Sequence, residues 1–310
     1  MGAGAASGLR RGEGQASGKL ILLGEHAVVH GEPALSTTLP AGVRVVVDPR
    51  AHGGRSIDGG RLTEDVRLAS AVTAAARQLH IPDDAAFDVS IGGDLPVAVG
   101  LGSSAALAVA LARALAAARG SGVTADEIVA AAHAVEGEFH GTPSGVDVTT
   151  ILAGGLGWFE KGPPRHWEAV RPKVAFELVV AVVDRRHDTS RTVGSLRARS
   201  AAHPGVYRAL FASIGALVRE ARAAIETGDL TRLGEAMTCD HGLLRTCGVS
   251  TPTLDAAVDE ALAAGALGAK LTGGGGGGAI VALAPLAAAD LAERLRLPGR
   301  LPFVVRIEAG

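Results

Sequence analysis

The chain has 310 residues and a mass of 31.1 kDa, enough for two ordinary domains or for one large domain with two lobes. Its 30 Lys and Arg residues are balanced by 32 Asp and Glu residues, so it lacks the basic excess with which proteins bind a nucleic-acid backbone. Hydrophobic residues make up 47% of the chain and aromatic residues only 3%, so the core must consist mainly of Ala, Val and Leu. We therefore expect no nucleic-acid partner.

Two uncharged stretches, 95–112 and 271–289, are long enough to raise the question of a membrane span. The first contains Pro96 and several Gly and Ser residues, and the second contains six consecutive glycines, so neither suits a bilayer. No targeting segment is recognisable, and two cysteines are too few for a disulfide scaffold. The sequence predicts a cytoplasmic protein without membrane contact.

The first half of the chain mixes predicted strands and helices. Residues 1–17, rich in Gly, Ala and Ser, are expected to form a disordered leader. The apolar run from Lys19, closed by Gly24, predicts a buried strand. Further on we expect strands at 43–48 and 87–91 and helices at 64–80, from about 103 to 119, and from a capping box at Thr124 and Glu127 to about 140.

The second half shows the same mixture. Prolines 163, 164 and 172 predict a lobe boundary near 161–173. Beyond it we expect a strand at 176–183, interrupted helices over 189–245, a helix after Pro252, strands near 268–272, 279–284 and 302–308, and a helix between the last two. No internal repeat is visible. The pattern predicts an α+β fold of two lobes, with domains at 18–165 and 173–310 after the leader.

A glycine-rich loop precedes the helix at about 103. The segment runs Pro96-Val-Ala-Val-Gly-Leu-Gly-Ser-Ser-Ala-Ala106. Glycines let a ligand approach the backbone, and the helix that follows directs its free N–H groups toward the loop, so we expect a bound anion, foremost a nucleotide phosphate. A plain serine N-cap is the alternative, and a dinucleotide fingerprint is a weaker one because its acidic residue is missing. A Walker A loop does not fit.

A second glycine loop, Gly273–Gly278, follows Lys270-Leu-Thr between two predicted strands. Six successive glycines cannot pack a core and are costly to order. The loop either forms a flexible hairpin connection or lies flat against a ligand or against the first glycine loop. We favour the second interpretation, because a two-residue turn is a simpler way to join two strands.

Charged residues gather near the break after the helix that ends at about 140. Glu136 and His140 share a helix face, and Asp147 follows a Gly-Thr-Pro-Ser-Gly break, which suits a loop carboxylate acting as general base beside a metal ligand. A solvated helix end with an N-cap at Asp147 is the equally open alternative. Lys19 opens a buried strand, where it requires an anionic partner.

Three separated blocks resemble the GHMP kinase superfamily and, within it, the mevalonate kinases. They are Gly18-Lys-Leu-Ile-Leu-Leu-Gly-Glu-His-Ala-Val-Val-His-Gly31, the Pro96–Ala106 segment and the Lys270–Gly278 segment, with His140-Gly-Thr-Pro-Ser-Gly-Val-Asp147 between the last two. The resemblance extends over residues 18–284. It implies an N-terminal lobe like ribosomal protein S5 that binds ATP and a ferredoxin-like C-terminal lobe, and it implies transfer of phosphate from Mg-ATP to mevalonate.

The resemblance also implies roles for individual residues. Asp147 would be the base that takes the hydroxyl proton, with Lys19 stabilising its carboxylate and the developing charge. Mg²⁺ would be bound by Ser104 and Glu136, and the mevalonate by Glu25, His26 and Thr189. The residues implied for ATP binding are Pro96, Gly100, Leu101, Gly102, Ser103, Ser104, Ala105, Gly273, Gly274 and Gly275.

Two points depart from the family or remain alternatives. The third block is all glycine where the family often has Gly-Ala-Gly-Gly-Gly, which can loosen the loop. Another small-molecule kinase of the superfamily, acting on phosphomevalonate, homoserine or a sugar, and a non-catalytic sensor are the alternative functions. The resemblance further suggests a homodimer.

Overall fold

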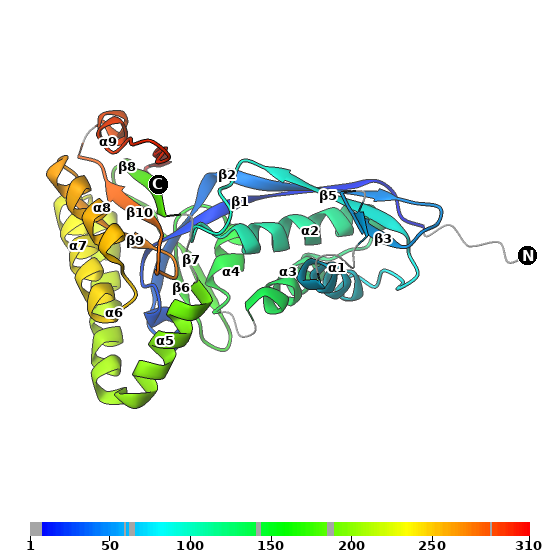
Figure 1. Ribbon diagram of the computed structural model, residues 1–310, viewed down its shortest axis with the longest axis horizontal. Helices are drawn as coiled ribbons and strands as arrows, with labels where there is room; N and C mark the ends of the chain where they lie inside the picture. Colours follow the sequence, from blue (N-terminus) through cyan, green and yellow to red (C-terminus); the bar gives the residue numbers. More distant parts are fainter. Residues whose placement is uncertain (1–7, 59, 62–65, 141–143, 185–188, 286) are drawn as a thin grey trace, which may run out of the picture. The chain divides into compact units, whose positions relative to one another are not determined.

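The computed structural model describes residues 8–58, 60–61, 66–140, 144–184, 189–285 and 287–310. The chain forms two compact units. The first comprises Met1–Gly18, Leu39–Leu95 and Ser103–Leu152, and the second Lys19–Thr38, Pro96–Gly102 and Ala153–Gly310. Both contain helices and strands, which confirms the α+β class (Figure 1).

The first unit is a sheet with helices beside it (Figure 1). Its strands come from β1 (Gly12–Leu23), β2 (Ala34–Pro49), β3 (Arg55–Ile57), β4 (Gly60–Arg61) and β5 (Phe87–Gly93). The later half of β2 pairs antiparallel with β5, from Val43 opposite Gly93 to Pro49 opposite Phe87, and β3 joins β5 in parallel. The helices are α1 (Val66–Gln78), α2 (Ser103–Arg119), α3 (Ala125–His140) and α4 (Val146–Ala153).

Small residues let β1 lie directly on α2. Gly12, Gly14 and Ala16 point inward along β1 while Glu13 and Gln15 are exposed. A Cβ atom added at Gly14 would lie 2.1 Å from the Ala110 carbonyl oxygen of α2. Glycine is therefore required on this face, because the two backbones leave no room for a side chain.

The second unit contains a four-stranded antiparallel sheet in the order β11-β8-β10-β9. These strands are β8 (Phe176–Asp184), β9 (Gly268–Thr272), β10 (Gly278–Leu283) and β11 (Phe303–Ile307), and every residue of β9 and β10 is buried. The start of β2 pairs with β6 (Gly157–Glu160), which pairs with β7 (His166–Ala169).

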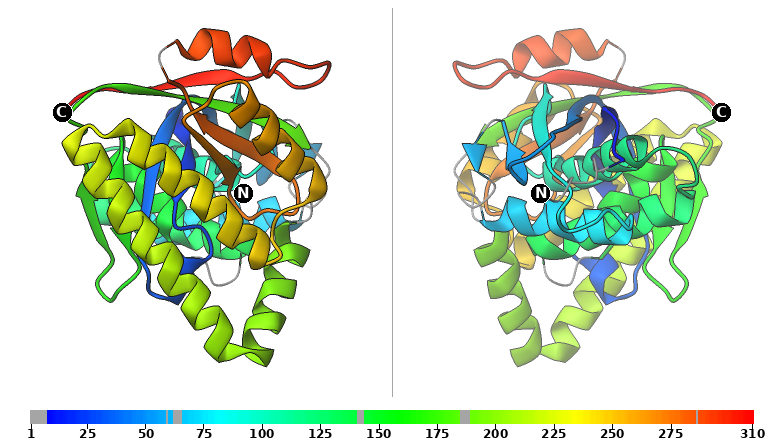
Figure 2. Two further views of the ribbon diagram at one scale, coloured as in Figure 1. Left: turned by 90° about the vertical axis from the view of Figure 1, so that its left-hand side faces the viewer. Right: turned by 90° about the vertical axis from the view of Figure 1, so that its right-hand side faces the viewer.

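Helices cover this four-stranded sheet. The long α6 (Pro204–Thr227) packs along α7 (Leu230–Thr246), and α7 and α8 (Pro252–Ala263) contact β9 (Figure 2, left). Asp229 and Thr251 begin α7 and α8 as N-caps, each accepting a hydrogen bond from a backbone N–H of the first turn. The remaining elements of this unit are η1 (Ala27–His30), α5 (Thr189–Ala202) and α9 (Ala288–Arg294).

Several local predictions are confirmed. The capping box forms as expected, because Thr124 N–H donates to Glu127 Oε2 at 2.7 Å and Glu127 N–H donates to Thr124 Oγ1 at 3.2 Å. The strand at 268–272 has the predicted bounds, and the glycine run connects it to β10. Helices over 189–245 occur as α5, α6 and α7, with breaks between them.

The expected leader differs from the structure in its later residues. Gly12–Ser17 belong to β1 and are not disordered, and the Arg10 N–H and Nε bind the carbonyl oxygens of Ala118 and Ala117 at the end of α2. Strand prediction depends on β-branched and aromatic residues, which are absent here because only glycine and alanine fit against α2. The sequence pattern also does not indicate the strands β3, β4, β6 and β7, which are only two to four residues long.

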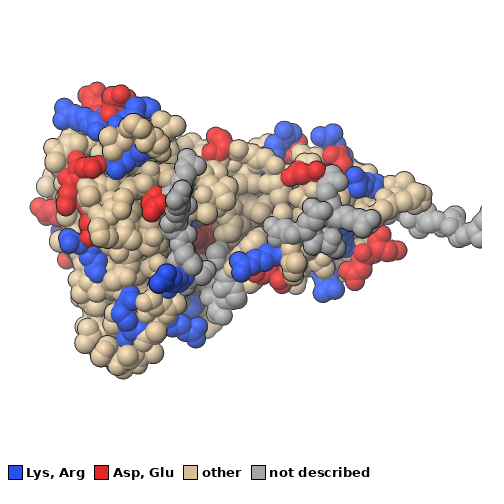
Figure 3. Space-filling model, in the orientation of Figure 1, with Lys and Arg blue, Asp and Glu red and all other residues tan. Residues whose placement is uncertain are grey.

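The domain boundary expected near 161–173 follows chain order, whereas the compact units interleave three segments each. On the face shown in Figure 3, positive and negative side chains are interspersed within each unit. Ion pairs such as Arg44 with Glu13 in the first unit and Arg300 with Glu260 in the second account for part of this mixing. Within the part of the chain that the structure describes, no helix has both the length and the apolar character needed to cross a membrane.

The contact between β1 and α2 makes a stability prediction. Gly14→Ala places a Cβ atom against the Ala110 carbonyl, and such overpacking destabilises a protein by about 1–3 kcal/mol. Gly137→Ala in α3 is the control: its Cβ meets nothing within 4 Å, and alanine favours the helix by about 0.5–1 kcal/mol. Urea unfolding of both variants measures the difference. A Gly14→Ala protein as stable as wild type would show that β1 lies farther from α2.

Candidate active site

The first glycine loop, Pro96–Gly102, belongs to the second unit, and α2 begins at the next residue, Ser103. Gly100 and Gly102 adopt left-handed φ angles of 86° and 75°. A Cβ atom at Gly102 would lie 2.7 Å from the Lys19 side chain, so this position requires glycine for both its conformation and its space. The loop therefore lies directly on Lys19.

Lys19 is buried, as its position at the start of an apolar strand predicted. Its side chain is 2% exposed, its N–H donates to Leu101 O at 3.0 Å, and its Nζ lies 3.5 Å from Gly100 O. The ammonium group is thus held at the carbonyl side of the glycine loop. A buried cation in this place is an electrostatic site for an anion.

The second glycine loop lies against the first. A Cβ atom at Gly273 would be 2.8 Å from Gly100 Cα, and one at Gly100 would be 2.9 Å from Thr272 O. The two loops pack backbone to backbone, which confirms the interpretation that the second loop lies flat against the first. Five residues of the run have positive φ: Gly273, Gly275, Gly276, Gly277 and Gly278. Gly274, where the family often has alanine, is not among them.

Three buried charged residues surround the entry to this second loop. Lys270 on β9 is completely buried and forms ion pairs with Glu25 Oε1 and, at 3.4 Å, with Asp240 Oδ2 of α7. Lys270 Nζ also donates to Leu271 O at 2.9 Å. Glu25, expected to contact substrate, is 1% exposed, and its Oε2 has no hydrogen-bond partner among the described residues. No local sequence pattern indicates this cluster, because Glu25 and Lys270 lie 245 residues apart in the chain.

Burial raises the pKa of Asp240 to about 7, and the positive charge of Lys270 opposes this rise only in part. One lysine faces two carboxyl groups, so a proton on Asp240 leaves the cluster electrically balanced. Asp240 therefore acts as the neutral member of the cluster below neutral pH.

His26 lies at the turn between β1 and η1. Its φ of 62° is unusual for a residue with a side chain, and its backbone precedes the 3₁₀ turn of Ala27–His30. Burial and the nearby charge of Lys270 lower the pKa of His26 to about 4. The imidazole is therefore neutral at pH 7, and its buried Nε2 finds no hydrogen-bond partner in the described part of the chain. It is a polar group available to a ligand.

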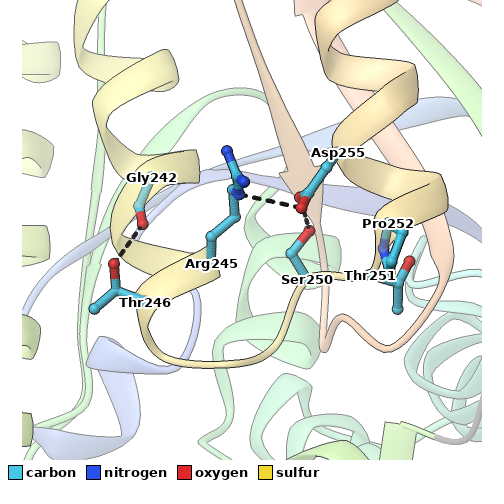
Figure 4. A pocket seen from close by; sticks show the side chains of 7 residues that line it. All are labelled: Gly242, Arg245, Thr246, Ser250, Thr251, Pro252 and Asp255. Carbon is cyan, nitrogen blue, oxygen red and sulfur yellow. Dashed lines mark hydrogen bonds and ion pairs between the residues drawn. The ribbon is translucent and has the colours of Figure 1, made fainter.

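A network of polar contacts around His241 and Asp255 extends from the charge cluster to the surface. Buried His241 accepts a hydrogen bond at Nδ1 from Leu271 N–H at 3.3 Å, and its Nε2 lies 3.2 Å from Asp255. Asp255 also accepts from Ser250 Oγ and pairs with Arg245 at 3.1 Å, in a surface pocket of about 530 Å³ (Figure 4). Burial lowers the pKa of His241. This network connects α7, α8 and β9.

The residues assigned to magnesium lie in the first unit. Ser104 is in the first turn of α2, and Glu136 is on α3, which packs against α2. The Glu136 side chain is buried, its Oε2 makes no hydrogen bond to a described residue, and His133 Nδ1 lies 3.5 Å away. A buried carboxylate oxygen with spare capacity suits Mg²⁺, which takes few protein ligands and completes its shell with phosphate and water. No cluster of three or more metal-ligating side chains occurs among the described residues.

Asp147 lies in the first turn of α4 in the first unit. The expectation of a loop carboxylate is therefore wrong for its secondary structure: Gly145, with φ of 84°, ends the break, and the helix begins at Val146. An aspartate in a first turn is stabilised by the positive end of the helix dipole. Its carboxyl group is half-buried.

The remaining predicted site residues distribute over both units. Ser103 and Ala105 lie in α2, whereas Pro96, Leu101 and Gly275 lie in the second unit. Thr189 is the first residue of α5, and its side chain and that of His140 lie outside the described part of the structure. Asp147 and Lys19 belong to different units, so their pairing stays a prediction.

Comparison with known families and proteins bears on this arrangement. The sequence matches the family description "GHMP kinases N terminal domain" at residues 67–155 and "GHMP kinases C terminal" at residues 199–300. The mevalonate kinase of Pyrococcus horikoshii is 33% identical over 94% of this chain and 94% of its own length. The mevalonate kinase of Methanothermobacter thermautotrophicus is 32% identical over 90% of this chain and 92% of its own.

The fold is likewise similar to a solved structure. The crystal structure of L. major mevalonate kinase in complex with R-mevalonate superimposes with a TM-score of 0.80 at 28% identity, covering 96% of each chain. The similarity therefore extends over both units of this chain, and the mevalonate in that structure is bound by the L. major protein.

The raised pKa of Asp240 predicts a pH-dependent stability. The folded protein retains a proton that an unfolded aspartate loses near pH 4, so the free energy of unfolding falls as the pH rises from about 4 to about 7. This slope approaches about 1.4 kcal/mol per pH unit for one group. Asp240→Asn removes the titrating group and flattens the curve in that window. Urea unfolding at several pH values measures it, and parallel curves for both proteins would contradict the assignment.

Proposed function

The chain belongs to the GHMP kinase family and its function is that of a mevalonate kinase; we propose that its two glycine loops, Lys19, Glu136 and Asp147 carry out phosphate transfer from ATP to the 5-hydroxyl group of mevalonate. The observation that carries this function is the similarity to named mevalonate kinases over 94% of both chains. The packed glycine loops above a buried lysine support it, because phosphoryl transfer depends on positioning and on neutralising charge.

The nucleotide phosphates are assigned to the first glycine loop and the start of α2. Backbone N–H groups at the beginning of a helix attract phosphate, and α2 begins at Ser103 directly after the loop. The Gly273–Gly275 segment packs against this loop at Gly100 and so helps to hold it in place. Side chains are excluded there, which leaves the backbone free to approach the nucleotide.

Mg²⁺ is assigned to Ser104 and Glu136, because the Glu136 side chain is buried and its Oε2 makes no hydrogen bond to a described residue, which fits a hard cation. Bound there with ATP, the ion would neutralise phosphate charge. Glu136 holds its carboxylate in place from α3, and Ser104 contributes its hydroxyl from the first turn of α2.

Asp147 is the proposed base. It removes the proton from the 5-hydroxyl group, and its position in the first turn of α4 fixes where its carboxyl group lies. Lys19 stabilises negative charge that develops during the transfer, since its ammonium group is buried beside the glycine loop. Asp147 belongs to the first unit and Lys19 to the second.

The mevalonate is assigned to Glu25, His26 and Thr189. The neutral imidazole of His26, with its unpaired buried Nε2, is a hydrogen-bonding group for a substrate hydroxyl or carboxylate. The Oε1 atom of Glu25 forms the ion pair with Lys270, so only its Oε2 atom is available to substrate. We further propose two domains, at 18–165 and 173–310, and a cytoplasmic location. We also propose that the protein is a homodimer, and analytical ultracentrifugation measures its oligomeric state.

The test of this function is ADP release by purified protein with Mg-ATP and four acceptors offered separately: mevalonate, phosphomevalonate, homoserine and galactose. Turnover with mevalonate alone supports the proposal. Turnover with another acceptor keeps the nucleotide and magnesium assignments and replaces the acceptor. Absence of turnover in protein that binds ATP would favour a sensor.

Asp147→Asn should lower kcat by roughly 10²-fold or more, because the amide cannot accept the hydroxyl proton. ATP affinity should stay close to that of wild type. Asp126→Asn is the matched control, since Asp126 also lies in the first turn of a helix and is exposed. Near-normal turnover by Asp147→Asn would remove Asp147 from the role of base.

Glu136→Gln should raise the Mg²⁺ concentration needed for nucleotide binding and turnover, because an amide oxygen binds the cation more weakly than a carboxylate. Calorimetric titration of ADP at several Mg²⁺ concentrations reads this without turnover. Glu138→Gln, on the exposed side of the same helix, is the control. An unchanged magnesium dependence in Glu136→Gln would exclude this residue as a ligand.

A further inference from the structure

Arg199 on α5 makes four hydrogen bonds within the second unit, all from its guanidinium group. Nη2 donates to the carbonyl oxygens of Cys247 at 2.8 Å and Gly248 at 3.2 Å. Nε donates to Tyr207 Oη at 3.2 Å and Nη1 to Ser195 Oγ at 2.5 Å. The half-buried guanidinium group thus joins α5, the start of α6 and the turn after α7.

The turn that Arg199 contacts has little freedom of its own. Its carbonyl groups follow the end of α7, where helices leave acceptors unsatisfied, and Arg199 supplies the donors. Gly248 has a φ of 72°, and a Cβ atom there would lie 2.9 Å from Arg199 Nη2. Glycine is required at this position both for its conformation and to admit the arginine.

The same turn holds the second glycine loop. Gly276 N–H donates to Val249 O at 2.8 Å, and a Cβ atom at Gly275 would lie 2.1 Å from that oxygen. Val249 is completely buried, so its carbonyl group cannot move without the packing around it. The position of the glycine loop therefore depends on the turn at 247–249.

Helix α5 approaches the loop a second time. A Cβ atom at Gly276 would lie 2.1 Å from Thr192 Oγ1, one turn into α5. Thr189, assigned to mevalonate, is the first residue of this helix. Arg199 is ten residues farther along the same helix, so one rigid element connects the proposed acceptor residue, the loop contact and the Arg199 contact.

We propose that Arg199 is a positioning residue for phosphoryl transfer: through the Cys247–Val249 turn it holds the Gly273–Gly278 loop against α5. This inference rests on the proposed function, because it takes the loop to be the nucleotide side of the site and α5 to be the acceptor side. Arg199 itself touches neither substrate. Its guanidinium group is suited to the task because it presents several donors in one fixed plane, which a lysine does not.

The test combines loop exchange with kinetics. In Arg199→Met, which keeps the apolar stem and loses every donor, deuterium exchange of the 273–278 peptide should accelerate about tenfold or more, since hydrogen bonds to charged groups contribute about 1.5–3 kcal/mol. KM for ATP should rise by a similar factor, and kcat should fall less. Arg199→Lys should restore part of both. Tyr207→Phe, which removes one acceptor of Arg199, should show a smaller change in the same direction.

Arg222→Met is the matched control. Arg222 is also half-buried in the second unit, pairs with Glu168 at 2.7 Å and lies over the Trp158 ring, and it shares no hydrogen-bond partner with Arg199. Its loss should lower the thermal midpoint without changing loop exchange or KM.

Two results would overturn the proposal. One is unchanged loop exchange in folded Arg199→Met. The other is loop exchange that rises equally in Arg222→Met, which shows a general loss of stability. Failure of the proposed function is separate, because it appears as wild-type protein that transfers no phosphate to mevalonate, whereas the exchange comparison needs no turnover.

Discussion

The close approach of two glycine backbones, Gly100 and Gly273, is the constraint on which the rest of the site depends. Any side chain at either position would force the two loops apart. With both loops in contact, Lys19 lies directly beneath Gly102, and the second loop reaches the turn that carries His26. The glycines at these positions are thus required by the close approach of the two backbones.

A buried charge cluster stands behind these loops. Removing Lys270, Glu25 and Asp240 from water is costly, and hydrophobic residues of similar volume often stabilise a core as well or better. Unlike hydrophobic contacts, these ion pairs require a fixed arrangement of their atoms. They therefore fix the positions of β9, α7 and the turn after β1 relative to one another. His26 is the next residue after Glu25, and the second glycine loop begins shortly after Lys270 on β9. The cluster therefore fixes the segments that lead into both.

The segment proposed to bind the nucleotide phosphates, Pro96–Ala106, is divided between the two units. Pro96–Gly102 pack with the second unit, and from Ser103 on the chain packs with the first. The assignments divide in the same way: Ser104, Glu136 and Asp147 come from helices of the first unit, and Lys19 and His26 from the second. Ser104 and Asp147 lie in the first turns of their helices, each directly after a glycine with positive φ, Gly102 before α2 and Gly145 before α4.

The sequence alone determined the features that depend on near neighbours in the chain. The glycine loops, the capping box at Thr124, the burial of Lys19 and the strands on either side of the glycine run are written in short segments, and the structure has them as expected. The tertiary structure alone decided which distant segments meet. Glu25 and Lys270 are 245 residues apart, Arg199 and Cys247 are 48 apart, and β1 could begin at Gly12 only because α2 passes close to it. Such pairings depend on how helices and sheets pack. The sequence around a residue does not indicate which distant residue it will contact.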